Sequence, residues 1–118
     1  MAPVTNPQKR KGSTFELEVA RYLEANGFPY AARRFGAGAK LDRGDIDGIP
    51  GVVIEVKNHA RIVLSEWVDE MRAEQANAGA NEGIVVVKRK GKPVAESYVV
   101  TTLAEWARLN GDGGLASP

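Results

Sequence analysis

Charged side chains that could carry out hydrolytic chemistry are concentrated in the segment RGDIDGIPGVVIEVK, which ends at Lys57. Its second half, Val52–Lys57, has the β-branched composition of a buried strand. Side chains alternate between the two faces of a strand, so Glu55 and Lys57 should share one face, about 6–7 Å apart along the strand. A turn at the Gly-Ile-Pro-Gly stretch would bring Asp45 and Asp47 near the same end.

Such a group of carboxylates and one lysine matches the needs of phosphodiester hydrolysis. Two or three carboxylates can hold a divalent cation, which lowers the pKa of a bound water and offsets charge on the phosphate. The lysine can orient or deprotonate that water, or stabilise the developing negative charge. Two plainer interpretations stand beside this one. Glu55 and Lys57 could form a solvated ion pair, and Asp45 and Asp47 could be turn residues.

The composition restricts the metal to one held by oxygen atoms. The chain has no cysteine and one histidine, which excludes thiolate sites and leaves too few histidines for a histidine-rich zinc site. Carboxylates favour Mg²⁺, with Mn²⁺ as a substitute, and we expect no small-molecule cofactor. No apolar run approaches the roughly 20 residues that a membrane span requires, and no signal core is seen, so we expect a cytoplasmic protein.

The elements that must position these residues indicate one α/β domain. We predict a flexible basic arm over residues 1–12, a single domain over 13–109 and a flexible tail over 110–118. The fold predicted is a mixed central sheet of about five strands flanked by helices. Helices are expected at 13–27, capped by Ser13, and at 65–78, capped by Ser65 with Val68, Met71 and Gln75 on one face. A last helix is expected to run to about 109 and to be capped by Thr102, which forms a capping box with Glu105. Strands are expected at 30–35, 45–47, 52–57, 84–87 and 98–100.

The register of the turn before Val52 decides whether Asp45 can reach Glu55. A regular two-residue turn at Pro50 and Gly51 would pair Asp45 with Val56 and direct its carboxylate to the wrong face. We therefore expect a longer loop or a bulge, and a regular two-residue hairpin would count against Asp45.

Two motifs in the chain resemble a known family. Gly44-Asp45-Ile46 followed by Ile54-Glu55-Val56-Lys57 resembles the PD-(D/E)XK nuclease signature, with Gly in place of the usual Pro. The block KGSTFE, which ends at Glu16 and leads into a helix, resembles the opening of archaeal and phage Holliday junction resolvases. The loop FGAG that begins at Phe35 departs from the resolvase pattern, because it lacks a serine.

The resemblance implies a restriction-endonuclease-like core and a set of site residues. Mg²⁺ would be bound by Asp45, Glu55, the carbonyl of Val56 and Glu16, while Lys57 would activate or position the water. Asp47 stays the reserve ligand. Glu16 has an alternative role, because Ser13 and Glu16 also form a capping box. Gln75 is a candidate contact to the scissile phosphate or its water.

The implied activity is cleavage of four-way (Holliday) junctions, as in phage or bacterial recombination. Paired nicks on two strands require a symmetric homodimer, for which apolar helix faces such as that of Trp106 could provide the interface. Other endonucleases of restriction, repair or nicking type, and a catalytically silent DNA-binding module, are the alternatives. The candidate DNA contacts are Lys9, Arg10, Lys11, Arg33, Arg34, Lys40, Arg43 and His59.

Overall fold

A computed structural model describes residues 7–34 and 43–112 of the chain, with side chains from position 10 onward. Along the described chain the elements alternate as the sequence predicts: helix, three strands, helix, two strands, helix. They are α1 (Pro7–Ala25), β1 (Ala32–Arg33), β2 (Ile46–Asp47), β3 (Val52–Lys57), α2 (Leu64–Ala78), β4 (Glu82–Val87), the short 3₁₀ helix η1 (Val94–Glu96), β5 (Tyr98–Val100) and α3 (Leu103–Asn110).

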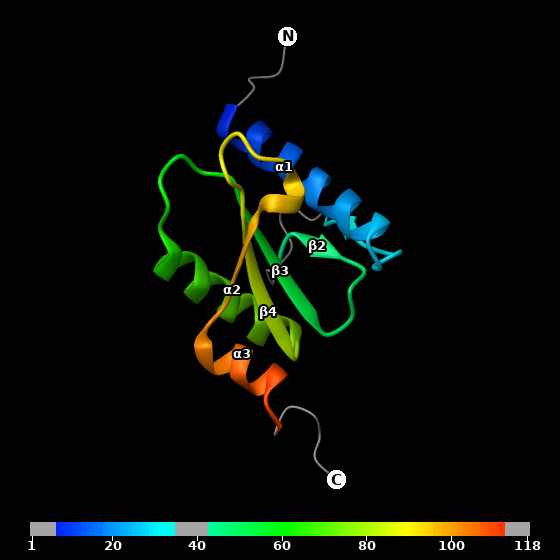
Figure 1. Cartoon of the computed structure of the whole chain (residues 1–118), viewed down its shortest axis with the longest axis vertical. Helices are drawn as coiled ribbons and strands as arrows, with labels where there is room; N and C mark the ends of the chain where they lie inside the picture. Colours follow the sequence, from blue (N-terminus) through cyan, green and yellow to red (C-terminus); the bar gives the residue numbers. More distant parts are fainter. Residues whose placement is uncertain (1–6, 35–42, 113–118) are drawn as a thin grey trace.

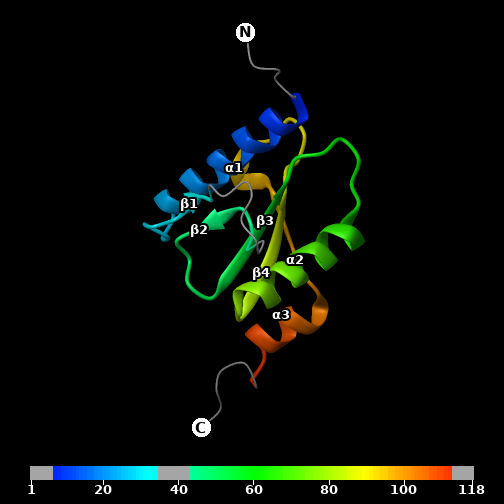
Figure 2. The ribbon, with the colours of Figure 1, turned by 180° about the vertical axis from the view of Figure 1, so that it is seen from behind.

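The described strands divide between two sheets. β3 pairs with β4 in parallel and β4 pairs with β5 antiparallel, which gives a mixed sheet in the order β3-β4-β5. β1 and β2 form a separate antiparallel pair. The α/β class is thus confirmed, whereas the prediction of a single five-stranded sheet is wrong. β2 lies beside β3 (Figures 1 and 2) but forms no ladder with it.

Two apolar cores lie on opposite faces of the sheet because the side chains of β3 alternate. The residues on the α1 side are Phe15, Val19, Ala20, Ala31, Ile46, Ile54, Val56 and Val86. Those on the α2 side are Val53, Trp67, Met71, Val85 and Val87. Figures 1 and 2 show α1 and α2 on opposite sides of β3 and β4. The predicted division of faces along Val52–Lys57 is confirmed, and Glu55 and Lys57 belong to the face toward α2.

Two of the three predicted helix starts are wrong. α1 begins at Pro7, where proline suits the first turn because its missing N–H has no partner there. Residues 7–12 of the predicted arm are therefore helical, and residues 1–6 lie outside the described part. α2 begins after Val63 with no side-chain cap, so the predicted cap at Ser65 is wrong. The cap at Thr102 is confirmed, since its side chain accepts a hydrogen bond from the Glu105 N–H at 3.2 Å.

The strand predictions hold best where the apolar pattern is strongest. β3 and β5 have the predicted bounds, and β4 begins two residues earlier than predicted, at Glu82. β1 is shorter than predicted, and Phe35 lies outside the described residues. Within the described residues, no helix has the length and apolar character needed to cross a membrane.

Candidate metal and catalytic site

Asp45 is held against β3 by two hydrogen bonds. Its N–H donates to the Ile54 carbonyl at 2.8 Å, and its Oδ2 accepts from the Val56 N–H at 2.8 Å. Gly44 permits this approach, because it has a φ of 94° and an added Cβ would lie 2.9 Å from the Ile54 carbonyl oxygen. The carboxylate thus takes the place of a ladder partner. The turn before Val52 is the two-residue turn at Pro50 and Gly51, closed by a hydrogen bond of 3.2 Å from the Val52 N–H to the Ile49 carbonyl, so the expected longer loop is wrong. Because β2 and β3 form no ladder, the regular hairpin that would have directed Asp45 to the wrong face does not form either.

The Val56 backbone offers a further oxygen at this edge. Within a strand, the N–H and C=O of one residue point to the same edge, and alternate residues share that edge. The Val56 N–H and the Ile54 carbonyl both face Asp45, while the Lys57 carbonyl accepts from Lys88 on the β4 side. The Val56 carbonyl therefore faces the Asp45 side, as a metal ligand there would require.

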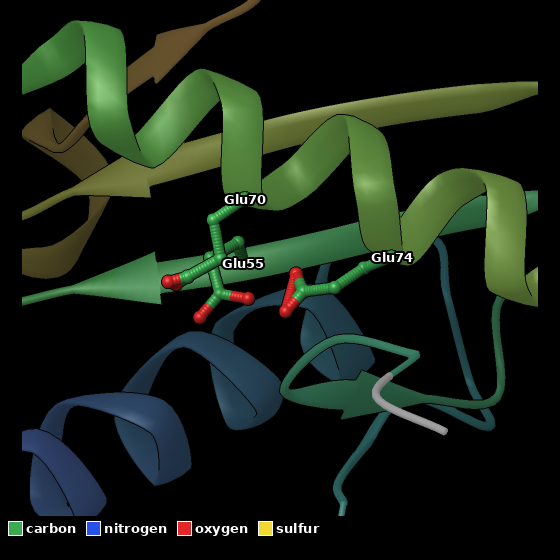
Figure 3. Close-up of side chains that lie close together, drawn as sticks. All are labelled: Glu55, Glu70 and Glu74. Carbon is green, nitrogen blue, oxygen red and sulfur yellow. The ribbon is translucent and has the colours of Figure 1, made fainter.

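Glu55 meets two glutamates of α2 that the sequence analysis missed. One carboxylate oxygen each from Glu55, Glu70 and Glu74 lies within 4.8 Å of the others, and Figure 3 shows them converging from β3 and α2. Glu70 and Glu74 are one helical turn apart and share a face. We refer to these three residues as the glutamate cluster.

The glutamates were missed because the predicted face of α2 was out of phase. The buried residues of α2 are Trp67, Met71 and Glu74. The face predicted from Val68, Met71 and Gln75 is displaced by one position, which leaves Glu74 off it. The spacing of Trp67 and Met71 was the signal available in the sequence, since the next position of that stripe is 74.

Burial and mutual contact raise the pKa values of two carboxyl groups. Glu55 is 6% exposed, and burial followed by its contact with Glu74 raises its pKa to about 9. Burial followed by contact with Glu55 raises the pKa of Asp45 to about 9. Among the described residues no donor reaches Glu55 Oε2, which is buried. Charge of this kind inside a protein calls for a counter-ion or for protons.

Lys57 supplies the positive charge next to these carboxylates. Its Nζ lies 3.7 Å from Glu55 Oε1, and 2.7 and 3.0 Å from the two carboxylate oxygens of Glu70. Burial lowers the pKa of Lys57, but the hydrogen bond to Glu70 and the surrounding carboxylates outweigh it, so the pKa is raised overall. The prediction that Glu55 and Lys57 share one face of the strand is confirmed.

Glu16 neither caps its helix nor joins the glutamate cluster. Ser13 lies inside α1, so the capping box is wrong. Glu16 Oε2 instead accepts from Arg33 Nε at 2.9 Å, and the same guanidinium donates to Ser13 Oγ. Its charge nevertheless contributes to the raised pKa of Asp45. Glu16 therefore lies at the Asp45 end of the site, held by Arg33.

Two accessory candidates are engaged away from the carboxylates. Asp47 pairs with Arg34 and is 44% exposed at its side chain. Gln75 donates to the Ala80 carbonyl and to Glu105 at the far end of α2. Of the two aspartates, Asp45 is therefore the one that contacts Glu55, and the Gln75 amide is directed to Ala80 and Glu105.

The predicted DNA contacts differ in their exposure and in their partners. Arg10, Lys11 and Arg43 are exposed, whereas Arg33 and Arg34 are used in the ion pairs described above. His59 is exposed, with its ring 5.4 Å from that of Trp67. The Lys9 side chain and Lys40 lie outside the described residues. Trp67 is in the core, whereas Trp106 is 59% exposed.

Comparison of the chain with protein-family models, with curated proteins and with solved structures gave no match.

Proposed function

We propose that the chain is a metal-dependent endonuclease that hydrolyses phosphodiester bonds, with Asp45, Glu55 and Lys57 at its centre. The observation that carries the proposal is the arrangement at the Asp45 edge of β3. Asp45 is anchored to the Val56 N–H and contacts Glu55, and Lys57 lies beside Glu55 at 3.7 Å. A half-buried carboxylate, a buried one and an ammonium group in contact are the groups that metal-assisted hydrolysis uses.

The residues present fit a hard divalent cation. Asp45, Glu55 and the Val56 carbonyl are all oxygen donors, and the buried Glu55 Oε2 accepts no hydrogen bond from the described residues. Mg²⁺ is the expected ion and Mn²⁺ its substitute. Such an ion would lower the pKa of a bound water and offset charge on the phosphate. The glutamate cluster offers Glu70 and Glu74 as further ligands, and the family resemblance adds Glu16.

The chain's own side chains have separate tasks in this proposal. The Val56 N–H fixes the Asp45 carboxylate, and the central strand fixes Glu55. Lys57 is held as an ammonium group by Glu70 and Glu55, so it is suited to stabilise negative charge on the phosphate and to orient the attacking water. To reach the phosphate, Lys57 must exchange its contact with Glu70 for one with the substrate.

The proposed substrate is branched DNA, most specifically a four-way junction, and the proposed assembly is a homodimer. Both follow from the likeness of the KGSTFE block and the D…ExK motif to Holliday junction resolvases. Cleavage of linear duplex by another PD-(D/E)XK type of endonuclease is the rival within nucleases. A silent DNA-binding module is the rival of another class, and the intact set of Asp45, Glu55 and Lys57 counts against it.

The deciding experiment is a nicking assay on a synthetic four-way junction and on a linear duplex of matched sequence, with Mg²⁺ or with a chelator. We expect Mg²⁺-dependent cleavage of the junction. Lys57→Ala should abolish cleavage and leave junction binding largely intact, while the exposed-site control Arg21→Ala should keep both. Equal loss of binding and cleavage in Lys57→Ala would remove the assigned role. Calorimetry that detects no Mg²⁺ binding would favour the silent module.

A further inference from the structure

A basic pocket lies at the end of the sheet where the parallel strands β3 and β4 both finish. Its volume is about 500 Å³, and its walls come from α1, from the loop after β3 and from the turn after β4. A hydrogen bond of 3.0 Å from the Lys88 N–H to the Lys57 carbonyl joins the two strand ends. In α/β proteins, ligands bind preferentially outside the carboxyl ends of such strands.

The charged side chains that line this pocket are positive. Among the described residues, its lining holds no acidic side chain and five lysines or arginines: Lys11, Lys88, Arg89, Lys90 and Lys92. Lys88 Nζ lies 5.1 Å from the centre of the Phe15 ring, and the Arg89 guanidinium lies 4.9 Å from that of Tyr98. Aromatic rings hold these cations without neutralising them. Arg89 also approaches Glu96 at 4.0 Å. The net positive charge attracts an anion.

The pocket begins at the end of β3 that carries Lys57. Asn58, which lines the pocket, directly follows Lys57 in the chain. Its apolar lining, which includes Ile62 and Tyr98, can contact the sugar or base of a nucleotide. The volume is within the roughly 300–1,000 Å³ of pockets that take small molecules, enough for a nucleotide unit and far too small for a duplex.

We propose that this pocket binds the phosphodiester backbone of a locally unpaired nucleic acid strand as that strand leaves the catalytic centre. The identification of the strand as substrate rests on the proposed nuclease function. The binding itself does not, because it can be measured without cleavage. The turn Lys88–Lys92 becomes a recognition element that the predicted DNA contacts did not include.

The test removes the two exposed lysines of the turn in the double variant Lys90→Ala/Lys92→Ala. The matched control Arg21→Ala/Arg72→Ala removes the same charge from exposed positions outside the pocket. Fluorescence anisotropy with chelator present measures the affinity for a labelled single strand and for a four-way junction over a range of salt. We expect the pocket variant to bind both at least about fivefold more weakly, with a salt slope smaller by about 1.4 on the single strand. The control should match wild type, and Mg²⁺ affinity should be unchanged in both variants.

Three results would overturn the inference. One is an unchanged affinity and salt slope in the pocket variant. Another is an equal loss in the control. The third is displacement of the labelled strand by deoxythymidine monophosphate or inorganic phosphate as effectively as by unlabelled strand, which would identify a small-ligand pocket. A failure of the nuclease proposal would give a different result from these three. The wild type would bind the strand through Lys90 and Lys92 but would cleave no DNA with Mg²⁺. In that case the proposed strand-binding pocket would stand and the proposed nuclease activity would be rejected.

Discussion

The carboxyl groups of Asp45 and Glu55 are in contact. If both are ionised they repel one another, and a bound cation or a proton removes that repulsion. Their raised pKa values mean that, without metal, at least one proton stays in the pair near neutral pH. The same proximity that would bind a cation tightly therefore lowers the stability of the metal-free protein as these groups ionise. We therefore expect that the carboxylates that give the site its metal affinity also lower the stability of the metal-free protein.

The metal-free protein should lose stability as the pH rises. The folded-state pKa values of Asp45 and Glu55 are raised, so their contribution is fully present below the unfolded values near 4 and is lost as the pH rises toward 9. Unfolding by urea in chelator should show a loss of roughly 1–3 kcal/mol between about pH 5 and about pH 9. Glu55→Gln should flatten this profile and Mg²⁺ should reverse it, whereas the exposed control Glu24→Gln should follow wild type. A wild-type stability that rises over this range would contradict the assignment.

Gly44 is the residue that allows Asp45 to reach β3. Gly44→Ala combines an unfavourable positive φ with a Cβ placed 2.9 Å from the Ile54 carbonyl oxygen, so the segment must shift and Asp45 with it. Gly51→Ala is the matched control, because its φ is also positive, at 77°, but nothing lies within 4 Å of the added Cβ. Both should lose about 1–2 kcal/mol from the backbone conformation. Calorimetry should find that only Gly44→Ala loses Mg²⁺ affinity, and equal affinities would exclude Asp45 as a ligand.

At the scale of elements, α3 is joined to the sheet through one buried carboxylate. Glu105 is 8% exposed, and its Oε2 accepts from the Gly83 N–H at 2.8 Å. Burial raises the pKa of Glu105, but the hydrogen bonds from Gly83, Gln75 and Arg108 outweigh it, so the pKa is lowered overall. Its stabilising contribution is therefore present above the unfolded pKa and is lost as the pH falls through the folded one.

Removal of this link should loosen α3 without affecting the catalytic site. Glu105→Ala should cost about 1–3 kcal/mol of unfolding free energy, because the Gly83 N–H loses its acceptor. Glu105→Gln should cost less, since it keeps an acceptor oxygen, and the exposed control Glu24→Ala should cost little. Urea unfolding and Mg²⁺ titration of each variant test this. A Glu105→Ala protein as stable as wild type would show that α3 docks by other contacts.

The sequence was most informative where a pattern is local. The apolar run of β3 and the Thr102 cap depend on neighbouring residues, and both were predicted correctly. Glu74 was missed because the face that α2 buries is set by how the helix lies on β3, and a stripe shifted by one position fits the sequence equally well. The pairing of Glu16 with Arg33 joins residues distant in the chain, so nothing in either local pattern indicates it.

The division of the strands into two sheets has a similar cause. The sequence indicates that a strand precedes the turn before Val52, but not that Gly44 lets a side chain replace the ladder. The expectation of a longer loop before Val52 is wrong, because Pro50 and Gly51 form a two-residue turn, yet Asp45 still contacts Glu55. The contact is possible because Asp45 bonds to β3 through its own N–H and carboxylate, with no ladder between β2 and β3.

At the scale of the whole molecule, an apolar face is left exposed on α3. Leu103 is 81% exposed and Trp106 is 59% exposed, and the two are neighbours on the helix surface at a spacing of three. β5 is the terminal strand in the order of its sheet, so its outer edge adds backbone groups that can pair. The paired nicks of the proposed function would need a second copy of the chain, and we propose this face as the contact between the copies.

Trp106→Glu should therefore convert a dimer into a monomer. A buried charge cannot be accommodated in an apolar contact between two copies, whereas a monomer would expose it to water at little cost. Light scattering should report a dimer for wild type and a monomer for the variant, with Mg²⁺ affinity retained because the face is separate from the carboxylates. Tyr30→Glu, at another aromatic position that is 81% exposed, is the control and should stay dimeric. On a four-way junction the monomer should produce single nicks in place of paired ones. The contrary result is a wild type that is monomeric in solution yet cuts both strands together. The two copies would then associate only on DNA, and α3 would not be the dimer interface in solution.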